Sequence, residues 1–362
     1  MSDGRFVDWG LAERVALGLA GDGGGARRPF RQPALDAACA DAVALVLDYT
    51  RLRPAEELPA PELVERAEWA RLGLRTLREL SADLERRIAE GISLPGPFGS
   101  VARSLGGAAA GVEAGVAVGY GARKVLAQYD VAMVTSDRPP RLVFIGPNLT
   151  AAHAELGEEP GIFLRWIAIH ESAHSVQFAS VPWLRPHLMG LLDELIKGAA
   201  ARLDLDSLRA LARRLFRTDP RAVIRTVLRG DLPRLLAGPE ESRALDRLQA
   251  TMSVIEGHAE HVMDAASTRL DPAYARLRDR LELRRASRSG LGEAIARLLG
   301  MELKVRQYTL GKAFCDAVVD EAGIEGLNAV WRASEALPTL QELEDPRSWL
   351  DRVRGNVPAE AA

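Results

Sequence analysis

The stretch Gly161–Ser180, GIFLRWIAIHESAHSVQFAS, constrains the fold and chemistry of this 362-residue chain more than any other segment. It contains the letters HESAH, in which His174 follows His170 by four residues and Glu171 comes directly after the first histidine. Residues four apart lie on one face of an α-helix, so two such imidazoles can hold one Zn²⁺. Glu171 then lies beside the metal and can take a proton from its water. The pattern predicts a zinc site, but a buried amphipathic helix with two incidental histidines would carry the same letters.

The residues around the motif predict the helix that it needs. Pro160 follows an acidic pair, which is typical of a helix start, and Val181-Pro182 marks the end. The apolar side chains at helical spacing are Ile162, Phe163, Trp166 and Ile169.

The two histidines of the motif are not sufficient, because a catalytic zinc ion needs three protein ligands and one open position. His153 and His187 are isolated in the sequence, whereas Glu256, His258 and His261 lie together in IEGHAEH. We therefore expect the third ligand, where one exists, to come from this second segment.

The segment Glu256–Ala259 resembles the N-E-G-x-A sequence of aminopeptidases of the zincin group, with Ile255 in place of the asparagine. The resemblance implies that Glu256, on a second helix, is the third metal ligand. It also implies that Gly257 lets the two ligand-bearing helices approach each other beside the metal. Glu256 lies 82 residues after His174, a longer spacer than in aminopeptidases, so the intervening helices are expected to be an insertion.

Most of the chain after residue 120 resembles a bacterial family of zincin-like hydrolases, or zinc-dependent metalloproteases, associated with biosynthesis of the deazaflavin coenzyme. The segments that carry the resemblance are Arg123–Asp130, Leu142–Leu149, Ile169–Leu188, Met252–Asp264, Lys304–Val318 and Ala336–Leu350. The family implies a mainly α zincin-like metalloprotease fold with a small β-sheet beside the active-site helix. It does not imply a particular substrate.

These residues predict a metal-dependent hydrolase that acts on a peptide or protein. Zn²⁺ held by His170, His174 and Glu256 would polarise the scissile carbonyl, with Glu171 as general base. His258 and Tyr308 are candidates for the donor that stabilises the oxyanion. Two alternatives stay open: an inactive zincin-fold scaffold protein, and a hydrolase of a non-peptide amide.

The composition argues against other partners. The net charge of −3 and the pI of about 6.2 give no electrostatic footprint for nucleic acid. The N-terminal residues carry no secretory signal pattern, and Cys39 and Cys315 match no metal or redox motif. We therefore expect a cytoplasmic protein without a disulfide framework; its oligomeric state is not indicated.

Leu94–Gly121 is rich in glycine and alanine, with glycines at every fourth position from Gly107 to Gly119. Such a repeat is known from membrane helices, but Glu113 and the small number of large aliphatic residues argue against a membrane span. We expect one or two core helices whose small residues let a neighbour approach closely.

Arg141–Ile145, RLVFI, is the clearest strand, lying between Pro139-Pro140 and Gly146. As an edge strand it could pair with an extended substrate, although a short core strand would look the same.

The chain is predicted to comprise an N-terminal helical region, residues 1–120, packed on a zincin-like catalytic domain, residues 121–362, or to form one continuous domain. The remaining predicted helices are Val7–Ala20, Pro33–Arg51, Pro61–Glu90, Trp183–Ala201, Glu240–Asp264 and Leu291–Ala322, with one or two more in Leu208–Leu236.

Overall fold

A computed structural model describes residues 6–21, 29–91, 97–130, 138–201, 239–268, 274, 276–280 and 301–355. The helices predicted within Leu208–Leu236, and the first ten residues of the one predicted from Leu291, lie outside these ranges.

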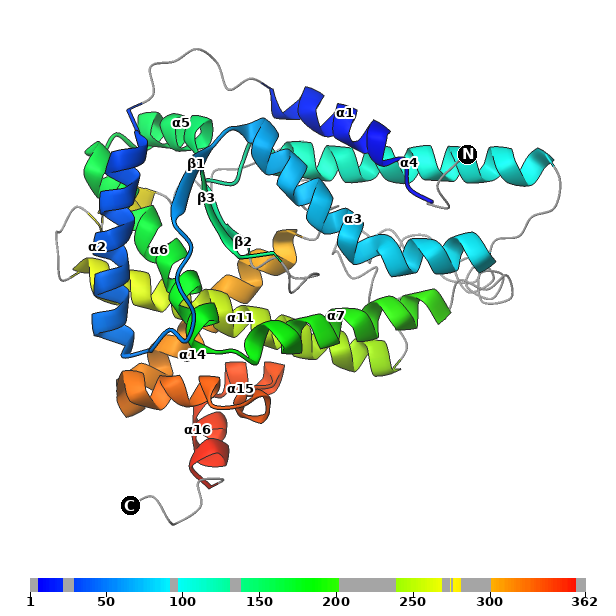
Figure 1. The fold of residues 1–362 in the computed structure, drawn as a ribbon. Helices are drawn as coiled ribbons and strands as arrows, with labels where there is room; N and C mark the ends of the chain where they lie inside the picture. The colour runs from blue at the N-terminus through cyan, green and yellow to red at the C-terminus, as the bar shows by residue number, and fades with distance from the viewer. Residues whose placement is uncertain are drawn as a thin grey trace.

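The described chain is mainly helical, with one small sheet (Figure 1). The α-helices are α1 (Trp9–Ala20), α2 (Gln32–Thr50), α3 (Arg66–Gly91), α4 (Pro97–Ala122), α5 (Gly146–Leu156), α6 (Pro160–Ser180), α7 (Leu184–Ala201), α11 (Pro239–Thr268), α14 (Met301–Asn328), α15 (Leu340–Glu344) and α16 (Pro346–Gly355). The strands are β1 (Pro61–Val64), β2 (Ala127–Asp130) and β3 (Arg141–Ile145), and two short 3₁₀ helices are η1 (Ala329–Trp331) and η2 (Ser334–Ala336). This architecture confirms the predicted fold class.

The sheet has the order β1-β3-β2, with β1 parallel and β2 antiparallel to β3. β3 is buried over most of its length, as its apolar run predicts for a central strand. The prediction of a strand at Arg141–Ile145 is confirmed, but its suggested role as a substrate-binding edge is wrong, because both of its edges are paired. β2, at the end of the sheet order, is the strand that packs against α6.

The prediction that Pro61 opens a long helix is also wrong, because Pro61–Val64 forms β1 and α3 begins only at Arg66. Two contacts explain the difference. Leu63 and Val64 pair with Phe144 and Ile145 of β3, and Gln32 clamps β1 through hydrogen bonds with the backbone of Pro61 and Leu63. Pairing with a distant strand thus outweighs the local helix preference.

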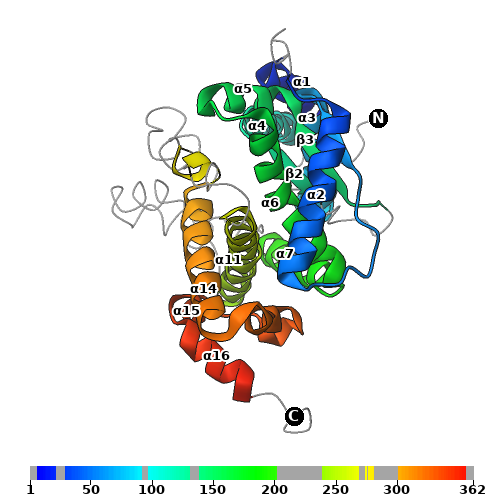
Figure 2. The same cartoon turned by 90° about the vertical axis from the view of Figure 1, so that its left-hand side faces the viewer.

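The described core contains four hydrophobic clusters, and α11 belongs to the two largest. The first joins α2, β3, α5 and α6 to the C-terminal half of α11. The second joins α7, the middle of α11, α14, η1, α15 and α16, and includes Trp331 and Trp349. Figure 2 shows α11 lying between α14 and the α6 side of the molecule. Because α2 and β1 contact α6 and β3 directly, the core crosses the suggested boundary at residue 120, and that division stays a prediction.

The glycine repeat of α4 faces α1, as the prediction of close helix packing requires. A methyl group on Gly107, Gly111, Gly115 or Gly119 would overlap backbone oxygens of the segment Phe6–Ala16. The four glycines therefore let the two helices approach to backbone contact. Among the described helices, none is both long and apolar enough to cross a membrane.

A second glycine contact joins α11 to α14. A methyl group on Gly257 would overlap the backbone at Gly311, and one on Gly311 would overlap the carbonyl oxygen of Ser253. Gly257 was expected to bring the two ligand-bearing helices together; instead it brings α11 against α14. The expectation of a close approach is right, but the partner helix is different.

We expect Gly311→Ala to destabilise the protein by about 1–3 kcal/mol, because the added methyl group overpacks this contact. The matched control is Gly190→Ala on α7, where a methyl group meets no atom within 4 Å. That substitution should stabilise slightly, since alanine favours a helix over glycine. Urea unfolding of the two variants measures both effects. Equal stability changes in the two variants would show that the α11–α14 contact is not tight.

Candidate metal centre

The motif helix α6 has a well-defined start. Pro160 occupies its first turn, and the Glu159 side chain accepts hydrogen bonds from the backbone N–H groups of Gly161 and Ile162 at 3.1 and 3.0 Å. Such a cap satisfies donors that a helix start leaves without partners. The helix is buried over most of its length between β2, α2 and α11, which fixes the direction of its histidines.

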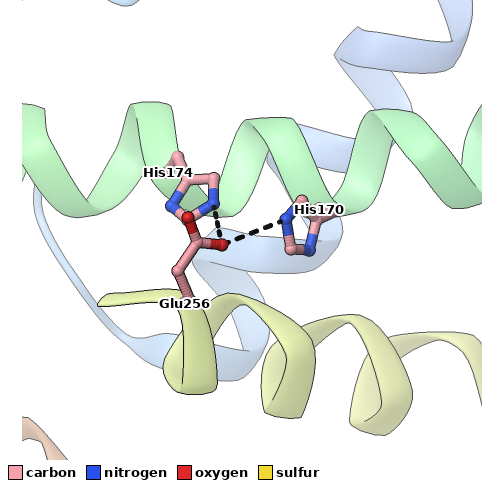
Figure 3. A group of neighbouring side chains, drawn as sticks. All are labelled: His170, His174 and Glu256. Carbon is pink, nitrogen blue, oxygen red and sulfur yellow. Dashed lines mark ion pairs between the residues drawn. The ribbon is translucent and has the colours of Figure 1, made fainter. Parts of the chain in front are cut away.

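His170, His174 and Glu256 point toward one another across the contact between α6 and α11 (Figure 3). One Glu256 oxygen lies 3.7 Å from His170 Nε2 and 3.4 Å from His174 Nε2. All three ligand atoms lie within 4.8 Å of one another. Among the described residues, this is the group of histidine, cysteine and carboxylate side chains that could hold a metal ion.

The geometry of this group fits a zinc ion. Ligands bound at 2.0–2.1 Å around a tetrahedral ion lie about 3.3 Å apart, close to the two separations from Glu256. Both separations are too long for good hydrogen bonds, so the three side chains leave room for an ion between them. Two imidazole nitrogens and one carboxylate are also a ligand set found in catalytic zinc sites.

The charges in the group depend on one another. Burial is the largest single effect and disfavours the protonated ring of His174, but the neighbouring side chains, Glu256 foremost and Glu171 after it, together outweigh burial and raise the pKa of His174 to about 9. The metal-free site thus attracts positive charge, which a bound cation would supply in place of the proton.

Glu171 lies next to the group and is almost fully buried. One of its oxygens accepts a hydrogen bond of 2.9 Å from the backbone N–H of Tyr129 in β2. Burial and the nearby charge of Glu256 raise the pKa of Glu171 to about 7, against the opposing effects of His174 and the Tyr129 N–H. A carboxylate with this pKa can both accept and release a proton near neutral pH, as a general base must.

The other histidines of α11 do not reach the metal group. The His258 side chain is fully buried and its ring packs edge to face on Trp331 at 5.4 Å. Burial lowers the pKa of His258 to about 3, so the ring is neutral. This position gives no support to the suggested role of His258 in stabilising an oxyanion, because substrate cannot reach a fully buried ring.

His261 is held on both ring nitrogens. Its Nε2 lies 2.6 Å from the Tyr49 hydroxyl, and its Nδ1 lies 2.7 Å from an Asp316 oxygen. These contacts leave no nitrogen of His261 for a metal. Tyr308 is part of α14, but its side chain lies outside the described side chains, so its suggested role stays a prediction.

Two residues near the site were not found from the sequence. Tyr129 acts through its backbone in β2, a strand that was not predicted because AQYD contains only one strong strand former. Gln177 follows His174 by three residues on α6 and is fully buried. Its spacing from the ligand was a usable signal, because residues three apart on a helix are neighbours.

Comparison with known proteins agrees with this site. The model of a family described as zincin-like metallopeptidases matches residues 7–350. The chain belongs to the zincin-like metallopeptidase family. As a zincin-like metallopeptidase family member, it is expected to bind a metal, usually zinc, and the group around Glu256 could hold one.

A solved structure resembles this zincin-like chain over almost its whole length. It is described as "a putative hydrolase with a novel fold" from Chloroflexus aurantiacus. The two share 27% sequence identity with a TM-score of 0.68, and the match covers 97% of this chain and 100% of the other. No curated protein shows a significant match. These findings support a hydrolase; the association with deazaflavin biosynthesis is not among them and stays a prediction.

Proposed function

We propose that the protein is a zinc-dependent hydrolase that cleaves peptide bonds with Glu171 as general base. The observation that carries the proposal is the convergence of His170, His174 and Glu256, with Glu171 beside them. Zinc, when bound, would lower the pKa of a water molecule and polarise the substrate carbonyl.

Glu171 would accept a proton from the attacking water and pass it to the leaving amine. The Tyr129 N–H holds one carboxylate oxygen, which fixes the side chain and leaves the second oxygen for the water. Because burial raises the pKa of Glu171 to about 7, the proton gained in the first step is released readily in the second.

None of the described strands pairs with the outer edge of β2, which makes this edge the element best placed to bind an extended substrate. The Ile145 N–H donates to the Leu126 carbonyl, so in the antiparallel ladder Ala127 and Tyr129 direct their N–H and C=O groups away from β3. The Tyr129 N–H, directed this way, reaches Glu171. A peptide that pairs with Ala127 would therefore lie alongside the general base, as strand addition to a sheet edge allows.

We expect the purified protein to bind about one Zn²⁺ per chain, because the three side chains complete a single catalytic ligand set. Elemental analysis after metal removal and zinc reloading measures the stoichiometry. In a broad peptide library, cleavage should cease after chelation and return with zinc. Folded protein that takes up no stoichiometric metal would refute the site, and zinc-loaded protein that cleaves no peptide but hydrolyses other amides would refute the peptide substrate.

A further inference from the structure

The ring of His174 has two nitrogens, but only one takes part in the metal group. Nε2 faces Glu256 at 3.4 Å, while Nδ1 lies on the other side of the ring (Figure 3). Nδ1 is buried and makes no hydrogen bond. A histidine that binds a metal through Nε2 keeps its proton on Nδ1, and metal-binding histidines usually donate that proton to an acceptor. This ring therefore needs an acceptor from the surrounding core.

Gln177 is in a position to supply it. It follows His174 by three residues on α6, so both side chains lie on one face of the helix, one turn apart. The Gln177 side chain is fully buried, yet neither its amide nitrogen nor its carbonyl oxygen makes a hydrogen bond. An unsatisfied buried polar group destabilises a fold, so an amide at this position needs an explanation.

Other buried polar groups are less suitable acceptors. Ser172 and Ser175 also lack hydrogen bonds for their hydroxyl groups, but they lie two residues before and one residue after His174, on other faces of α6. His258 lacks partners too, but its ring packs against Trp331.

We propose that Gln177 is a positioning residue of the metal centre, whose carbonyl oxygen accepts the proton of His174 Nδ1 and so directs Nε2 toward the metal. The inference rests on the proposed zinc site but concerns a residue that touches neither metal nor substrate. This role would also explain why residue 177 is a glutamine, although an apolar side chain there would leave no buried polar group without a hydrogen bond.

Gln177→Met tests the proposal, because methionine has a similar length and no comparable acceptor. Zinc affinity, measured by competition with a chromophoric chelator, should fall about 10–100-fold, as is typical when a partner of a metal-binding histidine is removed. The metal-free variant should melt at the same temperature or higher, because the substitution removes an unsatisfied buried amide. A residue with only a structural role would lower the melting temperature and leave the affinity unchanged.

Two further variants complete the test. Gln177→Glu keeps an acceptor oxygen and should restore zinc affinity at least to the wild-type value. Gln249→Met is the control: it removes a mostly buried glutamine from a different helix, α11, and should leave the zinc affinity unchanged. The absorption spectrum of the Co²⁺-loaded proteins reports ligand geometry and should change in Gln177→Met only.

The possible failures separate clearly. A folded Gln177→Met protein that binds zinc as tightly as the wild type overturns the positioning role alone. Equal losses of affinity in Gln177→Met and Gln177→Glu overturn it as well, because the acceptor oxygen would then not matter. Wild-type protein that binds no zinc overturns the metal centre itself and, with it, the proposed hydrolase.

Discussion

Glu171→Gln is expected to keep the fold and the zinc but to lower peptide hydrolysis by about 10²–10⁴-fold, the usual contribution of a general base. The glutamine has nearly the same shape, and its carbonyl oxygen can still accept the hydrogen bond from the Tyr129 N–H. It cannot accept a proton from the attacking water. Zinc content, thermal melting and turnover of a peptide library, compared between wild type and variant, measure the three properties separately.

The matched control for this variant is Glu85→Gln. Glu85 is also buried, but it belongs to α3 and accepts hydrogen bonds from the backbone N–H of Val7 and the ring N–H of Trp9. Its substitution should leave turnover unchanged. Equal turnover of Glu171→Gln and wild type would remove Glu171 from the mechanism, and loss of zinc together with activity would make it a ligand. Zinc retained without turnover in any of the proteins would favour a scaffold function.

Glu256→Ala is expected to weaken zinc binding far more than His258→Ala. Loss of Glu256 leaves the metal with two histidines, whereas loss of a residue outside the ligand set typically changes zinc affinity by only about 10–100-fold. In the structure Glu256 lies between both histidines of α6, while His258 packs against Trp331. Titration of the two metal-free variants with zinc decides the order.

The opposite order would exchange the two assignments, with His258 as ligand and Glu256 as its neighbour. His258→Ala also leaves a cavity beside Trp331, so its thermal melting has to be measured in parallel. A stability loss without a change in zinc affinity is the result expected for a core histidine.

Helices could be predicted from the sequence where apolar residues recur at helical spacing. Strands could not be predicted where their formation depends on pairing with a strand far away in the sequence. α2, α6 and α11 each carry such a face, and their predicted bounds differ from the observed ones by a few residues. β1 and β2 are four residues long, and both are held by pairing with β3. Neither PELV nor AQYD contains enough strand formers to reveal that pairing.

The third ligand was undecided in the sequence for a geometric reason. Glu256 and His258 are two residues apart, so their side chains leave the helix about 200° from each other and only one can face α6. The rotation of α11 about its axis makes the choice, and it is fixed by the contact of Gly257 with Gly311 on α14. The amino-acid sequence alone does not show which helix packs against Gly257.

The long spacer between the two parts of the site also sets the time at which the metal can be held. A chain is synthesised from its N-terminus at about 5–20 residues per second, so Glu256 leaves the ribosome roughly 4–16 s after His174. During this interval the nascent chain offers only the two histidines. The full ligand set forms only when α11 packs on α6. Zinc would therefore be acquired only after α11 has packed on α6 and would not serve as the nucleus around which α6 folds.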